Sequence, residues 1–244
     1  MSTQLIDVKA DIRDRLLHVA IRLFAERGID AVSLRTISTE AGSRNKSAVH
    51  YHFGSKLGIV EAIFEEFTRT IDQADGELLK QLESRAEDQS ISVAEILLAF
   101  YLPLFTIKSS EGYGRYAIKL LAKMMLDFTP EYQVLYQKLF QSRVARIYKL
   151  IQMQLPNKRE QDLKFQLMHG LMATITGIAT IDLMESSPLG DIRFNNEIQM
   201  MLSYVDYVTG GLTNEESCIN QIDTVFWQRY FQDNNIFPNK NSFS

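Results

Sequence analysis

Apolar residues recur at intervals of three and four along most of this 244-residue chain, and no segment shows the strict alternation typical of a half-buried strand. A first stripe runs through Ile12, Leu16, Val19 and Leu23, and Gly28 follows it. Residues at this spacing share one face of an α-helix, so the stripe predicts an amphipathic helix that ends near the glycine. The pattern as a whole predicts an all-α protein without internal repeats.

A short second helix is predicted after Ser33. The side-chain oxygen of a serine can accept a hydrogen bond from a free amide in the first turn of a helix, so Ser33 is a good N-cap. Leu34, Ile37 and Ala41 then fall at helical spacing, and Gly42 follows where a left-handed residue commonly ends a helix. The segment therefore predicts a single short amphipathic helix.

A third helix is predicted to begin between Asn45 and Ser47, because Ser43, Arg44 and Asn45 are turn-forming residues. Its inward positions are Ala48, Val49 and Phe53, and its outward positions are Lys46, Ser47, His50 and Tyr51. An outward face rich in hydrogen-bonding groups and poor in acids suits a groove bordered by phosphates. Residues 10–53 are therefore predicted to form a three-helix unit that contains a helix-turn-helix.

The same residues resemble the N-terminal domain of the TetR family of one-component regulators. The resemblance rests on LFAERG at 23–28, SLRTI at 33–37, AG at 41–42 and YHFGSK at 51–56, and it covers roughly the first 60 residues. It implies that the second helix of the motif enters the major groove of DNA. The SRNKS turn is one residue longer than is usual in that family.

Individual roles are implied by position in this resemblance. Contacts with bases, or close to them, are implied for Asn45, Lys46, Ser47 and His50, with Arg44 just before them in the turn. Contacts with phosphates are implied for Arg35, Tyr51, His52 and Lys56.

Some of these residues also fit ordinary structural roles. Tyr51 and Phe53 are suited to a core position, and Phe53 is for that reason not counted as a DNA contact. His50 and His52 have no cysteine or acid at ligand spacing, so neither a metal site nor a cofactor is predicted. Lys56 could be a solvated charge, but it stands at the start of the next predicted helix, whose N-terminus attracts a phosphate.

The charge of the chain is unevenly distributed. The formal net charge is −4, yet residues 1–60 carry nine Lys and Arg against six Asp and Glu, which leaves +3 there and −7 in the remainder. A basic end on an acidic chain predicts that only this end meets DNA. The single cysteine, Cys218, excludes an intramolecular disulfide and fits a reducing, cytoplasmic compartment. No signal peptide is visible, and the longest uncharged stretch, 165–181, contains polar residues, so no membrane span is expected.

Beyond residue 60 the pattern predicts a series of long helices. One opens at Ser55 and continues toward Leu82, and another contains Pro103, which is expected to kink or split it. The predicted helical segments after the first are about 92–107, 130–155, 160–186, 194–210 and 214–232. We expect a DNA-binding domain at 1–55, an effector-binding and dimerisation domain at 56–233 and a flexible tail at 234–244.

This layout resembles the TetR family in architecture as well, which implies a ligand-responsive repressor that acts as a homodimer. Segments 160–186 and 194–210 are predicted to supply half of an intersubunit four-helix bundle, because Gly170 and Gly177 let another helix approach closely. Packing within one subunit is the alternative role for these glycines. A dimer would hold two helix-turn-helix units one helical turn apart, as a palindromic operator in double-stranded DNA requires.

A small hydrophobic effector is a further partner that the resemblance implies. Aromatic and methionine side chains on the segments expected to surround a pocket would suit such a molecule, with plain core packing as the alternative. These residues are Phe100, Tyr101, Phe105, Tyr116, Met124, Phe128, Met168 and Met172. A DNA-binding dimer controlled by a protein partner, or not controlled at all, is the alternative function. An enzyme is not predicted, because the sequence has no Gly-rich phosphate loop and no nucleophile elbow.

Overall fold

A computed structural model describes residues 2–88, 91–126, 129–214 and 222–234. Every regular element among these residues is a helix, apart from an isolated bridge between Ser187 and Gly190, so the prediction of an all-α protein is confirmed. The α-helices are α1 Ser2–Arg27, α2 Leu34–Glu40, α3 Ala48–Phe53, α4 Lys56–Asp75, α5 Leu78–Glu87, α6 Val93–Lys108, α7 Gly114–Leu126, α8 Pro130–Gln154, α9 Glu160–Ala179, α10 Glu197–Thr213 and α11 Thr224–Asp233. A 3-10 helix, η1, covers Ile181–Ser186.

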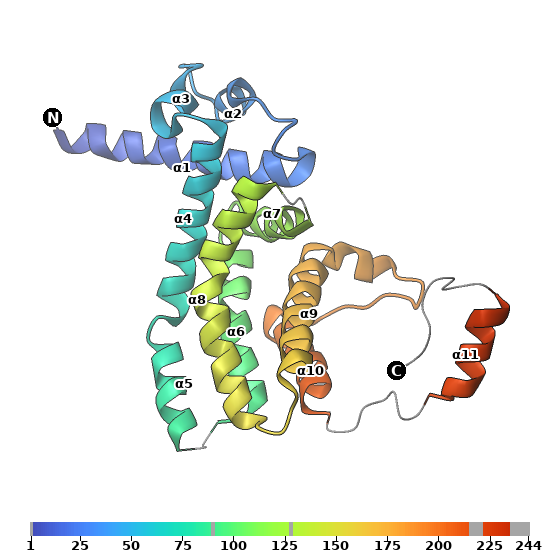
Figure 1. Ribbon diagram of the computed structural model, residues 1–244. Helices are drawn as coiled ribbons and strands as arrows, with labels where there is room; N and C mark the ends of the chain where they lie inside the picture. Colours follow the sequence, from blue (N-terminus) through green and yellow to red (C-terminus); the bar gives the residue numbers. More distant parts are fainter. Residues whose placement is uncertain (1, 89–90, 127–128, 215–221, 235–244) are drawn as a thin grey trace.

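The first three helices form a small head at one end of the molecule (Figure 1). Phe24 of α1, Ile37 of α2 and Val49 of α3 are fully buried, so the three helices share one apolar centre. Helix α4 begins in the head and runs down into the rest of the chain, which we call the body. Helix α4 is therefore shared by the head and the body.

The body is organised around α6, which packs against α4, α7, α8 and α10. Ten of the sixteen residues of α6 are buried, as expected for a helix enclosed on most sides. Helix α7 packs against α1 and so connects the body to the head. Helices α9 and α10 form the outer layer of the body (Figure 1).

Two features of the body differ from the sequence-based expectations. The helix predicted to run from Ser55 toward Leu82 ends at Asp75, and a separate helix, α5, follows Gly76. The segment with Pro103 remains one helix, because a side chain from α8 takes over the lost backbone contact. Arg143 donates a hydrogen bond to the carbonyl oxygen of Ala99 at 2.7 Å, and Ala99 is the residue whose oxygen the missing N–H of Pro103 would have met.

The glycines of α9 face α10 of the same chain. A Cβ atom on Gly170 would lie 2.7 Å from Cγ1 of Val208, and one on Gly177 would lie 2.4 Å from the hydroxyl of Tyr204. These glycines therefore permit the close packing of α9 on α10 within one subunit, which was the alternative role considered for them.

The C-terminal part of the described chain is less compact. Helix α11 stands clear of the body in Figure 1. The predicted tail at 234–244 and Cys218 lie outside the described residues, except for Asn234. None of the helices among the described residues is long and apolar enough to cross a membrane.

Candidate nucleic-acid interface

The turn between α2 and α3 is held by its own polar side chains. Gly42 adopts φ +69°, a left-handed conformation that only glycine adopts without strain. The Ser43 hydroxyl donates to the carbonyl of Asn45 at 3.0 Å, and the side-chain oxygen of Asn45 accepts from the amide of Ser47 at 2.9 Å. Helix α3 therefore begins at Ala48, just beyond the predicted start, because Asn45 stabilises a turn there.

The outward face of the turn and of α3 is polar and accessible. Tyr51 is 70% exposed, which places it on the surface and not in the core. The turn residues and the other outward position of α3 that sequence reasoning proposed are also exposed: Arg44, Asn45, Lys46, Ser47 and His50. On the opposite face Ala48 and Val49 are buried, as predicted.

Three further predicted DNA contacts flank this face. Arg35 is exposed on α2, whereas His52 and Lys56 are half-buried. The ring of His52 lies 5.1 Å from that of Tyr51 in an edge-on arrangement. The structure thus brings the outer part of α3, its preceding turn and the start of α4 together on one side of the head.

Lys56 has a structural role that the sequence did not indicate. Its ammonium group donates to the backbone carbonyl of Asp30, 3.0 Å away, in the connection between α1 and α2. Because an ammonium has three donors, one bond to Asp30 leaves others for a phosphate. Ser55 caps α4 by accepting from the amide of Gly58 at 3.0 Å, so the N-terminus of α4 is well formed beside Lys56.

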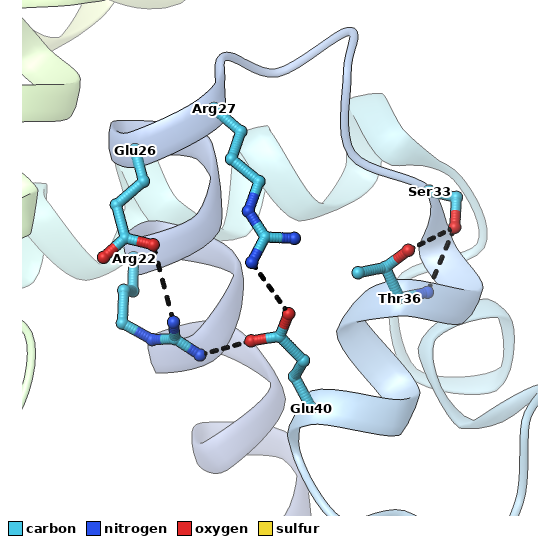
Figure 2. A network of polar contacts seen from close by, with 6 residues as sticks. All are labelled: Arg22, Glu26, Arg27, Ser33, Thr36 and Glu40. Carbon is cyan, nitrogen blue, oxygen red and sulfur yellow. Dashed lines mark hydrogen bonds and ion pairs between the residues drawn. The ribbon is translucent and has the colours of Figure 1, made fainter.

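An ion-pair network fixes α2 against α1 (Figure 2). Glu40 at the end of α2 accepts from Arg22 at 2.6 Å and from Arg27 at 3.1 Å, and Arg22 also lies 3.5 Å from Glu26. The hydrogen bond from Arg22 holds the pKa of the Glu40 carboxyl below its ordinary value. At the other end of α2, the Ser33 hydroxyl accepts from the amide of Thr36 at 3.1 Å, which confirms Ser33 as the N-cap.

A very tight corner sets the angle between α3 and α4. Gly54 adopts φ +72° at the end of α3, and α4 starts two residues later. A Cβ atom on Gly58 would lie only 2.0 Å from the carbonyl oxygen of Phe53, so this position has no room for a side chain. Sequence reasoning missed Gly58, although a glycine in the first turn of a predicted helix is unusual enough to signal a close approach.

The head meets the body through a second contact that sequence reasoning missed. The ring of His18 in α1 stacks on that of Tyr113, with 4.4 Å between centroids, and the Tyr113 hydroxyl lies 3.3 Å from the Glu66 carboxylate of α4. Burial lowers the pKa of His18, so the neutral ring is favoured. The Lys123 ammonium of α7 adds a bond to the carbonyl of Glu26 at 3.3 Å. These contacts join α1, α4 and α7 at the junction of head and body.

The described residues that were predicted to contact an effector differ in their burial. Phe100, Tyr101, Phe105 and Met124 are packed in the core, and Tyr116 is half-buried. Met168 and Met172 lie on the exposed face of α9, at 42% and 38% exposure, and Phe128 lies outside the described residues.

A groove of about 820 Å³ lies between α4 and α8. Phe64, Leu135 and Leu139 supply its apolar surface. The polar residues that line it are Glu61, Glu65, Thr68, Arg69, Asp72, Gln73 and Lys138. None of the predicted effector contacts within the described residues is among these lining residues.

The fold and this surface define a helix-turn-helix protein with a helical body. In keeping with this, the sequence model for "Bacterial regulatory proteins, tetR family" matches residues 16–63. A relative, the HTH-type transcriptional repressor KstR2 of Mycolicibacterium smegmatis, is 41% identical over 58 residues, which are 24% of this chain and 28% of the repressor. The chain thus matches less than a third of the length of that relative.

Solved structures share the fold over most of the chain. A bacterial regulatory protein in the tetR family from Rhodococcus RHA1 superimposes with a TM-score of 0.53 at 15% identity, over 84% of this chain and 98% of the other. A candidate transcriptional regulator from Saccharomonospora viridis, in complex with choline, gives 0.50 at 22% identity, over 81% and 95%. The tetR family model thus matches the head and the start of α4, the matched relative is a transcriptional repressor, and the solved structures share the overall fold.

Proposed function

We propose that this protein is a transcriptional repressor that binds a palindromic operator as a homodimer and is released by a small, largely apolar effector. The observation that carries the proposal is the exposed, hydrogen-bonding face of α3 and its turn, including Tyr51 at 70% exposure, on a head fixed by buried packing and ion pairs. Such a face presents donors and a phosphate-contacting rim to the major groove. We place this function in the cytoplasm, where bacterial DNA is found.

The outer layer of the body supports the dimer. Phe165, Met168 and Met172 lie at helical spacing on α9 and are 67%, 42% and 38% exposed. On α10, Tyr207 is 69% exposed and lies three positions after Tyr204, the residue that contacts α9. Because residues three apart share a helix face, Tyr207 borders the seam between the two helices. An apolar surface across two helices is suited to a two-fold four-helix bundle.

The experiment that tests the function is selection of binding sites from a random duplex library with the purified protein. A palindrome with half-sites about one helical turn apart is the expected outcome. Failure to enrich any sequence would show that the head does not bind specific DNA without a partner. Light scattering on the bound complex would count the subunits.

We predict that substitutions on the head separate into two kinds. Tyr51→Ala should weaken binding to specific and random DNA alike because it removes a phosphate contact, and it should leave the salt slope nearly unchanged because the tyrosine is uncharged. Lys46→Ala and Ser47→Ala should instead change the preferred bases, with a loss of about 1–3 kcal/mol on the selected operator. Fluorescence anisotropy at several salt concentrations measures both effects.

Thr39→Ala, on the exposed surface of α2, is the control and should bind as the unaltered protein does. Equal losses on operator and random DNA for all three head variants would rule out base contacts from the turn.

The groove between α4 and α8 is our proposed effector site. One wall of the groove is formed by α4, which begins in the head directly after α3. An effector that moves α4 relative to α8 would therefore also move α3. Three acids on its lining, Glu61, Glu65 and Asp72, outnumber the two bases, Arg69 and Lys138, and this excess favours an apolar molecule with a positively charged group. The Saccharomonospora viridis protein of similar fold is in complex with choline, a small cation.

We predict that Leu139→Trp blocks this site. The larger ring should fill the groove and weaken the binding of an apolar dye or cationic amphiphile by about tenfold or more, because the ligand loses its apolar floor. DNA affinity should not change, so the variant should remain bound to its operator in the presence of the compound. Dye displacement and operator release measure the two quantities.

Val134→Trp is the matched control, since Val134 is 63% exposed on α8 and does not line the groove. Equal responses of the two tryptophan variants to the compound would exclude the groove as the effector site.

A further inference from the structure

Helix α11 carries an aromatic face that its own chain leaves largely exposed. Phe226, Trp227 and Tyr230 are 55%, 40% and 44% exposed. Their rings contact one another, with 5.3 Å between Phe226 and Trp227 and 5.6 Å between Trp227 and Tyr230. Aromatic side chains are costly to leave in water and commonly anchor interfaces, so this cluster has the composition of a docking surface.

The arm formed by α11 leaves the body beside the exposed apolar end of α9. Lys158, just before α9, donates to the carbonyl oxygens of Gly211 at 3.3 Å, of Leu212, and of Asn214 at 3.4 Å. This ammonium therefore holds the end of α10 against the start of α9. The chain leaves α10 close to the first turns of α9, where Phe165 is 67% exposed.

The connection to α11 is long enough to reach a neighbouring subunit. Seven residues, 215–221, separate Asn214 from Ile222. An extended chain spans at most about 3.5 Å per residue, so α11 can start up to roughly 28 Å from Asn214. Packed helices lie about 8–10 Å apart, so this reach exceeds the thickness of a two-helix layer.

A two-fold axis places the matching ends of two copies at the same level along the axis. Two heads that bind one DNA duplex must lie at the same end of the dimer, so the two-fold axis runs from the heads to the far end of the bodies. Helix α9, Glu160–Ala179, runs along this direction, with its N-terminal end away from the head and its C-terminal end toward the head (Figure 1). The Phe165 ends of both α9 helices therefore lie at one level along the axis, and so do the starts of both arms.

We propose that α11 is an exchanged arm, and that its aromatic face packs on the Phe165 end of α9 in a second copy of this chain. Within one chain both apolar faces stay exposed, and α11 stands clear of its own α9 although its connection would let it return (Figure 1). In the exchanged dimer, each aromatic face of α11 and the α9 end on which it packs would cover each other. This inference rests on the homodimer of the proposed function, and it assigns α11 as the element that covers the edge of the dimer interface.

A photo-cross-linking experiment identifies the occupant directly. A benzophenone amino acid replaces Phe226 in unlabelled full-length protein, which is unfolded, refolded and reassembled with a ¹⁵N-labelled unaltered copy before irradiation. The expected products join the unlabelled α11 peptide to the ¹⁵N-labelled α9 peptide that contains Phe165. Cross-links found only within one isotope, or only outside α9, would overturn the exchange.

The dimer dissociation constant provides the second measurement. The double variant Phe226→Ala, Tyr230→Ala should dimerise about tenfold or more weakly in sedimentation equilibrium, because the aromatic contact is lost on both sides. Val225→Ala, on the opposite face of α11 and itself 65% exposed, should leave the constant within about twofold.

An unchanged constant for the double variant would overturn the arm while leaving the dimer intact. A monomeric unaltered protein would instead overturn the homodimer, and with it this inference.

Discussion

Replacing Gly58 with alanine is expected to remove specific DNA binding while leaving the body folded. The added Cβ would lie 2.0 Å from the carbonyl oxygen of Phe53, far inside van der Waals contact. That oxygen belongs to the backbone of α3, so no side-chain rotation can relieve the clash. Helices α3 and α4 must instead separate, and overpacking of this kind costs about 1–3 kcal/mol of stability.

The effect on DNA binding should be larger than the effect on stability. Helix α3 has only six residues, and the corner at Gly54 and Gly58 determines its angle. A change in that angle displaces every contact of α3 at once, and each lost base contact is worth about 1–3 kcal/mol. We therefore expect the affinity for the selected operator to fall by on the order of 100-fold.

Thermal unfolding and fluorescence anisotropy with the operator measure the two effects of Gly58→Ala. Gly210→Ala is the matched control, because a Cβ at Gly210 in α10 meets no atom within 4 Å and alanine favours the helix. Unaltered affinity and melting temperature for Gly58→Ala would show that the corner between α3 and α4 is not needed for binding.

The parts of the fold that the sequence predicts well depend on local chemistry. Ser33 and Ser55 accept hydrogen bonds from the first turns of α2 and α4, and Gly42 takes a left-handed conformation after α2. A cap or a positive φ involves only a few neighbouring residues, so residue types at fixed spacing indicate it. The exposed face of α3 follows in the same way, from its 3.6-residue period.

Contacts between distant segments could not be predicted from spacing. Lys56 donates to the carbonyl of Asp30, and His18 of the head stacks on Tyr113 of the body. The effector prediction shows the same limit, because Tyr101 lies in the core whereas Met172 is exposed on α9. Periodicity predicts which face of a helix is apolar, but the packing of the helices determines whether that face contacts the core, a cavity or water.

Pro103 shows how a neighbouring helix can change the outcome of a local rule. Proline removes one helical hydrogen bond and commonly kinks or breaks a helix, yet α6 continues from Val93 to Lys108. Arg143 supplies the missing donor from α8, with bonds to the carbonyls of Ala99 at 2.7 Å and Phe100 at 3.4 Å. Burial lowers the pKa of Arg143 to about 10, so the guanidinium stays charged at neutral pH.

Replacing Arg143 with methionine is therefore expected to destabilise the body. Methionine keeps much of the side-chain volume but leaves the carbonyl of Ala99 without a donor in the core. An unpaired buried carbonyl costs about 1–3 kcal/mol, and removal of the buried charge offsets only part of this loss. Urea denaturation at pH 7 measures the change.

The decisive experiment compares the stability of the Arg143→Met variant with that of the double variant Arg143→Met, Pro103→Ala. Alanine restores an N–H at position 103, which can donate to Ala99 in the regular helical pattern, so the double variant should recover most of the lost stability. The two substitutions should then be coupled by about 1 kcal/mol or more in a double-mutant cycle, as expected for groups that share one acceptor. Additive effects would mean that Arg143 stabilises α6 only through packing, for example against the ring of Phe100, and not by replacing the hydrogen bond that Pro103 lacks.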